Sequence, residues 1–126
     1  MPSRSKPAKI QRLPGRSPGR SAGSAHGPFA WTATTATDKT GDLVVQVRQV
    51  FEKLQSQLLK MGSDKRNIIS ATVWLADLRQ KPLFDEEWLD WVGPEPQHWP
   101  QRACIGATLA DGSLVEIAVL ALRQEP

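Results

Sequence analysis

Apolar residues recur at spacings of three and four over residues 42–61, and this is the clearest pattern in the chain. Polar side chains fill the positions between them, as in a helix with one buried face. Asp42 or Thr40 can cap the start of this helix, and Gly62 can end it. The apolar positions of this stripe are Val47, Val50, Phe51, Leu54, Leu58 and Met61. We therefore predict an amphipathic helix over 42–61.

A second helix is predicted over 82–92, because Pro82 suits a first helical turn and Gly93 follows the last apolar residue. The acidic side chains of this helix fall at helical spacing and are expected to form a solvated face. They are Asp85, Glu86, Glu87 and Asp90.

Four stretches read as strands: 29–37, 68–76, 102–109 and 113–122. The stretch 68–76 carries apolar residues on both faces of the expected strand, which predicts an inner strand. Asp111-Gly112 separates the last two and is a strong hairpin signal. The order of elements predicts an α+β fold with two helices on one face of a mixed sheet.

The other face of this sheet is also predicted to be apolar. Ile68, Trp74 and alternate residues of 114–122 would line it, and no third helix is available to cover it. An exposed apolar face of this size predicts self-association.

Charge divides the 126-residue chain into two parts. Residues 1–37 hold six basic residues and no acidic one, whereas the rest holds ten basic and thirteen acidic residues, so the net charge of +3 belongs to the N-terminal end. Residues 1–27 are rich in Pro, Gly, Ser and Arg, and are predicted to be a disordered tail, with a short edge strand near 10–13 as an alternative. The folded domain is predicted to span 28–126.

The cysteine content and hydropathy bear on location. Cys104 is the only cysteine, so an intramolecular disulfide and a cysteine-based metal cluster are excluded, and neither a metal nor a cofactor is expected. The sequence shows neither a membrane-span pattern nor a secretory signal. We predict a cytoplasmic protein that does not bind membranes. The Arg- and Ser-rich start also has transit-peptide composition, which leaves an organellar location as the alternative.

Two charged residues lie in or beside strands that otherwise read as buried. Arg102 precedes an apolar run, and Glu116 lies inside one. Buried charge is unfavourable unless it is paired or used. Arg102 could grip a carboxylate with two parallel N–H groups, or it could pair with an acid of a neighbouring chain. Glu116 could act as a general acid or base, or it could form a structural salt bridge, for which Arg102 itself is one partner.

Several blocks of the chain resemble the Rid (YjgF/YER057c/UK114) family of reactive-imine deaminases, also labelled L-PSP endoribonucleases. The most specific is Pro100-Gln101-Arg102-Ala103-Cys104 followed by Val115-Glu116-Ile117, and 62–64, 68–78 and 88–92 support it. The resemblance covers 32–122. It implies a chorismate-mutase-like fold of the bacillus type and a homotrimer whose sheets close into a barrel, with a pocket at each subunit interface.

By this resemblance, Arg102 binds the substrate carboxylate, Cys104 lines the pocket, and Glu116 handles water and a proton. No histidine lies near Cys104 in sequence to activate it as a nucleophile. Where the family usually has Ser-Gly-Gln, this chain has Ala33-Thr34-Thr35. A frequent family Asn falls on Asp85, a second Glu falls on Gly106, and a family Tyr has no counterpart in this tyrosine-free chain.

The sequence is therefore consistent with three functions. The first is hydrolysis of reactive 2-imino acids to 2-keto acids and ammonia. The second is a non-catalytic trimer that binds small carboxylates, which the changes at 33–35 favour. The third is binding or cleavage of RNA, which rests on the basic tail. Within that tail, Gly15–Arg20 is not a phosphate loop, because no strand is predicted before it and no helix after it.

Overall fold

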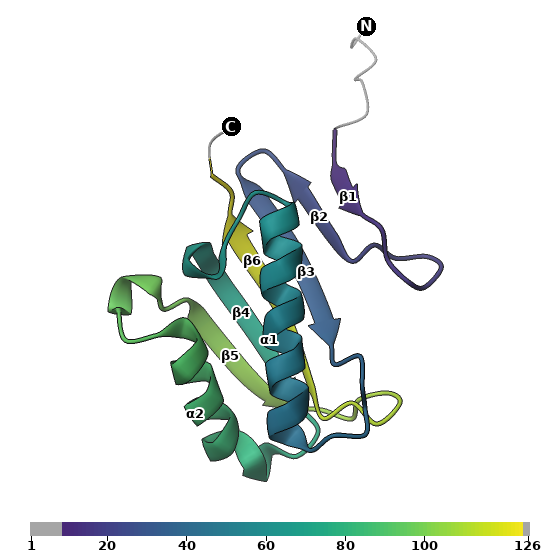
Figure 1. The fold of residues 1–126 in the computed structure, drawn as a ribbon, viewed down its shortest axis with the longest axis vertical. Helices are drawn as coiled ribbons and strands as arrows, with labels where there is room; N and C mark the ends of the chain where they lie inside the picture. Colours follow the sequence, from purple (N-terminus) through teal and green to yellow (C-terminus); the bar gives the residue numbers. More distant parts are fainter. Residues whose placement is uncertain (1–8, 125–126) are drawn as a thin grey trace, which may run out of the picture.

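The computed structural model describes residues 9–124, which form one six-stranded sheet with two helices on one of its faces (Figure 1). The strand order is β1-β2-β3-β6-β4-β5, and every neighbouring pair is antiparallel except β4 and β5. The elements are β1 (Gln11–Leu13), β2 (Gly23–His26), β3 (Phe29–Thr35), α1 (Leu43–Lys60), β4 (Ile68–Leu75), α2 (Lys81–Val92), β5 (Gln101–Gly106) and β6 (Val115–Leu122). The predicted α+β fold, with two helices on one face of a mixed sheet, is confirmed.

Helix α1 begins and ends where the sequence indicates. The Asp42 carboxylate accepts a hydrogen bond from the backbone N–H of Val45, which settles the choice of cap in its favour. At the other end Gly62 adopts a φ of 81°, a left-handed conformation that glycine accepts without strain. The apolar stripe of α1 lies against the sheet, where Val47, Val50 and Leu54 are fully buried.

Gln46 is a polar side chain in this apolar core. It is fully buried, and its amide nitrogen lies 3.2–3.3 Å from the carbonyl oxygens of Lys39, Gly41 and Gly112. Its carbonyl oxygen accepts a hydrogen bond of 2.9 Å from the N–H of Leu114, directly before β6. One side chain of α1 therefore joins the turn before the helix to the loop that leads into β6.

Aromatic side chains join the two helices. The rings of Phe51 in α1 and Trp91 in α2 stack with centroids 4.3 Å apart, and Phe84 and Trp88 surround Phe51 at 6.1–6.3 Å. This packing fixes α2 over the β4–β5 side of the sheet.

The predicted hairpin between the last two strands is wrong. Asp111 and Gly112 do form a turn with positive φ, but β6 inserts between β3 and β4, and β5 pairs in parallel with the far side of β4. A turn signal reports only the local backbone conformation. Which strand lies beside β5 is decided by contacts distant in sequence.

The N-terminal end also differs from its prediction. Within the segment expected to be disordered, β1 pairs with β2 and β2 pairs with β3, so the sheet extends well before residue 28. The alternative of an edge strand near 10–13 matches β1. Small residues make this pairing favourable, since Ala25 buries its whole side chain at little entropy cost. Residues 1–8 of the predicted tail lie outside the described residues.

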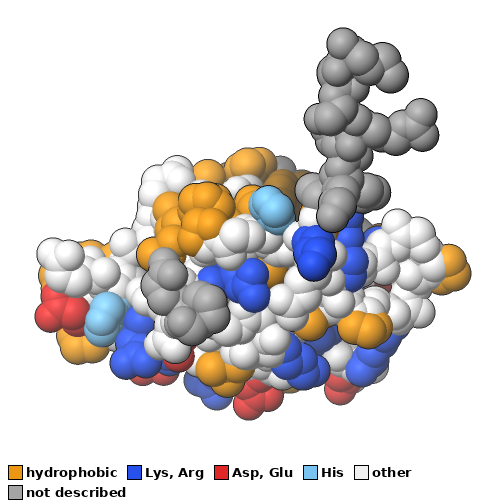
Figure 2. All heavy atoms as spheres, turned by 90° about the horizontal axis from the view of Figure 1, so that it is seen from above, with side chains coloured by type: hydrophobic (Ala, Val, Ile, Leu, Met, Phe, Trp, Pro, Cys, Tyr) orange, Lys and Arg blue, Asp and Glu red, His pale blue; other side chains and the backbone are white. Residues whose placement is uncertain are grey.

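The sheet face opposite the helices carries exposed apolar side chains, as predicted. Phe29, Trp31, Ile105 and Leu122 all lie on it and are exposed. Ile68 does not belong to this face, because a register irregularity between Ile68 and Ser70 turns it into the core. Seen from the end of the sheet where β1 begins and β6 ends, hydrophobic side chains gather at the upper left, several Lys and Arg side chains are scattered over the middle, and acidic ones lie towards the rim (Figure 2).

Candidate functional site

Arg102 lies on the edge strand β5, and its side chain reaches under α2. Its Nη2 donates a hydrogen bond of 2.7 Å to Oδ1 of Asp85, and its guanidinium lies over the rings of Phe84 and Trp88 at 5.4 and 5.2 Å. The side chain is only 18% exposed. Aromatic faces and one carboxylate thus hold the cation at the perimeter of the sheet, with donors left for a second anion.

Asp85 is not part of a solvated face, in contrast to the prediction. Lys81 donates a second hydrogen bond, 2.8 Å long, to its Oδ2. Partial burial would raise the pKa of the Asp85 carboxyl, but the hydrogen bonds and charges of Lys81 and Arg102 outweigh this and hold its pKa below the usual value. One carboxylate therefore serves two cations, and the cluster has a net positive charge that favours an anionic ligand.

Cys104 lies two residues beyond Arg102 on the same face of β5 and packs against the edge of the core. Burial raises the pKa of its thiol, and the nearby charges of Arg102 and Lys81 offset only part of that rise. A neutral thiol is a poor nucleophile. This environment favours a pocket-lining role for Cys104.

Glu116 lies on the opposite face of the sheet from Arg102. In β6 it pairs with Thr35 of β3 and Trp74 of β4, and Trp74 in turn pairs with Ile105 of β5. Ile105 and Arg102 are three residues apart on one strand, so their side chains point to opposite faces. One chain therefore does not bring Arg102 and Glu116 together, and a salt bridge between them within the chain is excluded.

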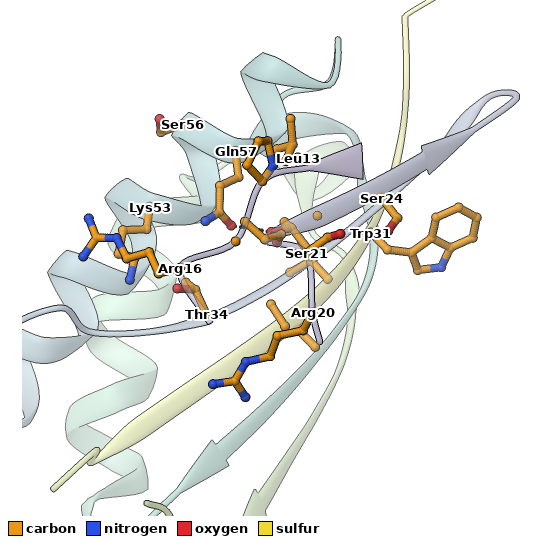
Figure 3. Close-up of a pocket in the computed structure, with 18 of the residues that line it drawn as sticks. Leu13, Arg16, Arg20, Ser21, Ser24, Trp31, Thr34, Lys53, Ser56 and Gln57 are labelled. Carbon is orange, nitrogen blue, oxygen red and sulfur yellow. Dashed lines mark hydrogen bonds between the residues drawn. The ribbon is translucent and has the colours of Figure 1, made fainter. Parts of the chain in front are cut away.

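Glu116 instead lines a cavity of about 830 Å³ at the edge of β3. Strand β2 pairs with β3 only as far as Thr32, so the edge of residues 33–35 has no strand beside it among residues 9–124. The loop over residues 14–22 passes beside this edge and forms the outer wall, and α1 forms another wall with Lys53, Ser56 and Gln57 (Figure 3).

Sequence reasoning missed the basic residues of this cavity, Arg16, Arg20, Lys53 and Lys60. The two arginines belong to the Gly15–Arg20 stretch that lacks the context of a phosphate loop. The basic residues of the tail are visible in the sequence and could suggest an anion-binding segment. Their position beside α1, however, follows only from the pairing of β1 with β2, which brings the loop against the helix. Lys53 lies on the polar side of the α1 stripe, where a solvated role was the simpler expectation.

The described residues contain neither a candidate metal cluster nor a membrane-spanning helix. Between residues 9 and 124, no three His, Cys, Asp or Glu side chains gather in a way that could hold a metal ion. Neither helix of this part of the chain has the length and apolarity to cross a membrane.

Comparison with known proteins agrees with the fold and identifies the family. The family model described as endoribonuclease L-PSP matches residues 24–123. A RutC family protein of Haemophilus ducreyi is 36% identical over 86 residues, which cover 68% of this chain and 72% of the relative.

Two solved structures show the same fold. An uncharacterized protein from Pseudomonas aeruginosa has a TM-score of 0.84 at 30% identity, over 92% of this chain and all of that one. A member of the YjgF protein family from Neisseria meningitidis also has a TM-score of 0.84, at 24% identity, over 94% of this chain and 98% of that one. The chain thus belongs to the endoribonuclease L-PSP family, that is, the YjgF/YER057c/UK114 or Rid family.

Proposed function

We propose that this protein is an imine and enamine deaminase that hydrolyses reactive 2-imino acids to 2-keto acids and ammonia. The observation that carries the proposal is the Arg102 cluster. Its half-buried guanidinium on an edge strand has donors left for a ligand, and the cluster has a net positive charge. Family membership and the carboxylate of Glu116 in an open cavity support it.

The active site in this proposal is completed by a second copy of the chain, because Arg102 and Glu116 of one copy face opposite sides of the sheet. Strand β5 is the edge at one end of the sheet; towards the other end, where β1 is the outer strand, residues 33–35 of β3 have a side that β2 leaves unpaired. Docking β5 of one copy at these residues of the next is a head-to-tail contact, the kind that forms a ring when the rotation between copies closes. We propose a homotrimer, in which the apolar sheet faces turn inward and Arg102 and Cys104 of one copy approach Glu116 of its neighbour.

The chemistry follows from the two groups. The guanidinium of Arg102 would hold the substrate carboxylate with charge-assisted hydrogen bonds. Glu116 would accept a proton from water as its oxygen adds to the C=N carbon, and would return a proton to nitrogen. Glu116 would next move the proton of the new hydroxyl group to nitrogen. The C–N bond then breaks, its electron pair leaves with ammonia, and a C=O bond remains. Both transferred protons come from water and no electrons are exchanged, so the scheme needs no cofactor.

The proposal is tested by measuring ammonia release from enzymatically generated 2-iminopropanoate, with light scattering to determine the oligomeric state. We expect a rate above buffer, a Glu116→Gln variant that is slower by roughly 10²–10⁴-fold, and an Arg102→Lys variant that loses most carboxylate binding. Glu52→Gln and Arg79→Lys, which alter exposed side chains, serve as matched controls.

The outcomes separate the alternatives. A trimer that binds 2-keto acids but shows no rate above buffer would be a carboxylate-binding module, and the enzyme proposal would fail. RNA cleavage by the chain without any imine hydrolysis would favour the third hypothesis. A stable monomer at micromolar concentration would refute the shared site. The cytoplasmic location stays a prediction.

A further inference from the structure

We infer that the cavity at the edge of β3 holds a second anionic group of the ligand, a carboxylate or a phosphate, through Arg16, Arg20 and Lys53. The inference deepens the proposed function, on which it rests for the first carboxylate, by naming the substrate class as dianionic 2-imino acids. Nothing in the Arg102 cluster itself calls for a second negative charge.

The lining of the cavity is strongly basic. Arg16, Arg20, Lys53 and Lys60 line it, and Glu116 is the one acidic residue on its walls among the described residues. None of the four cations has a carboxylate oxygen within 4.0 Å in this part of the chain, whereas five other basic residues do, namely Arg48, Arg66, Arg79, Lys81 and Arg102. Cations gathered in one hollow without acidic partners favour an anion there.

Lys53 shows the effect of this crowding. Its Nζ donates a hydrogen bond of 2.9 Å to the carbonyl oxygen of Thr35, at the unpaired edge of β3. Partial burial lowers the pKa of Lys53, and the charges of Lys39 and Arg16 lower it further. An anion between Arg16 and Lys53 would offset the repulsion between their charges, so the placement of these residues favours binding one.

The loop that carries the arginines is fixed to the sheet at its C-terminal end. The N–H of Ala22 bonds to the carbonyl oxygen of Leu13 at 2.9 Å, and the hydroxyl of the buried Thr32 donates to the carbonyl oxygen of Ala22 at 2.8 Å. The loop is also folded tightly on itself, since a Cβ on Gly15 would lie 2.5 Å from the carbonyl oxygen of Arg20. The backbone of the loop is thus fixed beside the sheet, and it places the exposed side chains of Arg16 and Arg20 at the cavity.

Figure 3 shows how the cations are arranged. Arg16 and Lys53 lie together beside α1, Arg20 extends across the sheet, and Thr34 lies between the two arginines in this view. Glu116 lines the same cavity. A substrate whose first carboxylate is held by Arg102 of a neighbouring copy, and whose reacting carbon lies at Glu116, would extend its side chain towards these cations. A second acidic group on that side chain would meet them.

The test is isothermal titration calorimetry of the full chain with three 2-keto acids at one salt concentration. They are 2-oxobutanoate, with one carboxylate, 2-oxoglutarate, with a second carboxylate, and 3-phosphonooxypyruvate, with a phosphate. We expect either 2-oxoglutarate or 3-phosphonooxypyruvate to bind about ten times more tightly than 2-oxobutanoate. Which of the two binds more tightly shows whether the cavity prefers a carboxylate or a phosphate.

The variants assign the preference to these residues. Arg16→Gln/Lys53→Gln is expected to remove most of the preference for the dianion and to leave 2-oxobutanoate binding within twofold. Arg20→Gln alone is expected to remove part of it. Arg79→Gln, which removes an exposed charge elsewhere, is expected to change neither. Circular dichroism and light scattering verify that each variant folds and assembles as the parent does.

The two proposals fail in different ways. Imine hydrolysis with equal binding of one- and two-charge acids would overturn this inference and leave the proposed function standing. A preference for dianions that depends on Arg16 and Lys53, without any imine hydrolysis, would uphold the anion subsite and refute the deaminase. A preference that persists in Arg16→Gln/Lys53→Gln would also overturn the inference.

Discussion

Replacing Gln46 by leucine tests whether a single buried amide holds the two ends of the fold together. Leucine keeps a side chain of similar length and helix propensity. It removes the acceptor of the Leu114 N–H and the donor shared by the carbonyl oxygens of Lys39, Gly41 and Gly112.

The expected effect can be worked out from the exposure of each group. The Leu114 N–H is half-buried before β6, and a donor left unpaired there costs about 1–3 kcal/mol. The three carbonyl oxygens belong to residues that water can reach, so their loss is a net hydrogen-bond contribution of about 1 kcal/mol in total. We therefore expect Gln46→Leu to lower the free energy of unfolding by roughly 2–4 kcal/mol.

Urea unfolding at a fixed protein concentration measures this difference, because an assembling protein changes its apparent stability with concentration. Gln49→Leu is the matched control on the same helix. Its amide accepts one exposed hydrogen bond from the N–H of Asp38, so its loss should be at most about 1 kcal/mol. If Gln46→Leu unfolds within 0.5 kcal/mol of the parent, roughly the size of an ordinary surface effect, the bridging role of Gln46 is refuted.

Three further outcomes follow from other parts of the structure. For Asp64, burial would raise the pKa of the carboxyl, but hydrogen bonds from Arg66 and Gln55 outweigh this effect and lower the pKa below 3.8. The stabilisation by the ionised carboxylate is therefore complete above pH 3.8 and is lost as the pH falls through the folded pKa. The stability difference between the parent and Asp64→Asn should shrink as the pH is lowered, and a constant difference would contradict this. Gly15→Ala should displace the 14–22 loop and weaken dianion binding in calorimetry, whereas Ser17→Ala should not; equal binding by both would show that the close approach of Gly15 to Arg20 is unimportant. Cys104 should react with iodoacetamide more slowly than free cysteine at pH 8, and Arg102→Met should slow it further; reaction as fast as that of the free amino acid would contradict the raised pKa.

The sequence predicts where the helices and strands lie better than it predicts which strands pair with each other. The α1 stripe specifies its own ends because Asp42 and Gly62 act within one turn of the helix. Strand pairing has no such local code. The Asp111-Gly112 turn is present, but the strands on either side of it lie on opposite sides of β4 and do not pair with each other. Composition alone gave no sign that residues 23–26 would add to the sheet.

The candidate site was predictable only as a set of residues. Arg102 and Glu116 stand out because each is a charged residue among apolar neighbours in the sequence, and this can be recognised without knowing the order of the strands. Their relation depends on strand register. Ile105 pairs with Trp74, and Trp74 pairs with Glu116, so these three side chains share one face. Arg102 lies three positions before Ile105 on β5, which puts it on the opposite face from Glu116. The role of Asp85 could not be foreseen, since its partner Arg102 lies seventeen residues away on another element.

The position of β6 has a consequence for how the chain is made. It is the last strand in chain order, yet it lies between β3 and β4 and forms hydrogen bonds with both. Until the ribosome has added residues 115–122, β1-β2-β3 and β4-β5 are two separate half sheets, each with an unsatisfied edge where β6 will insert. The complete sheet can therefore form only after these residues have been synthesised, and until then the edges of β3 and β4 that β6 will occupy stay open.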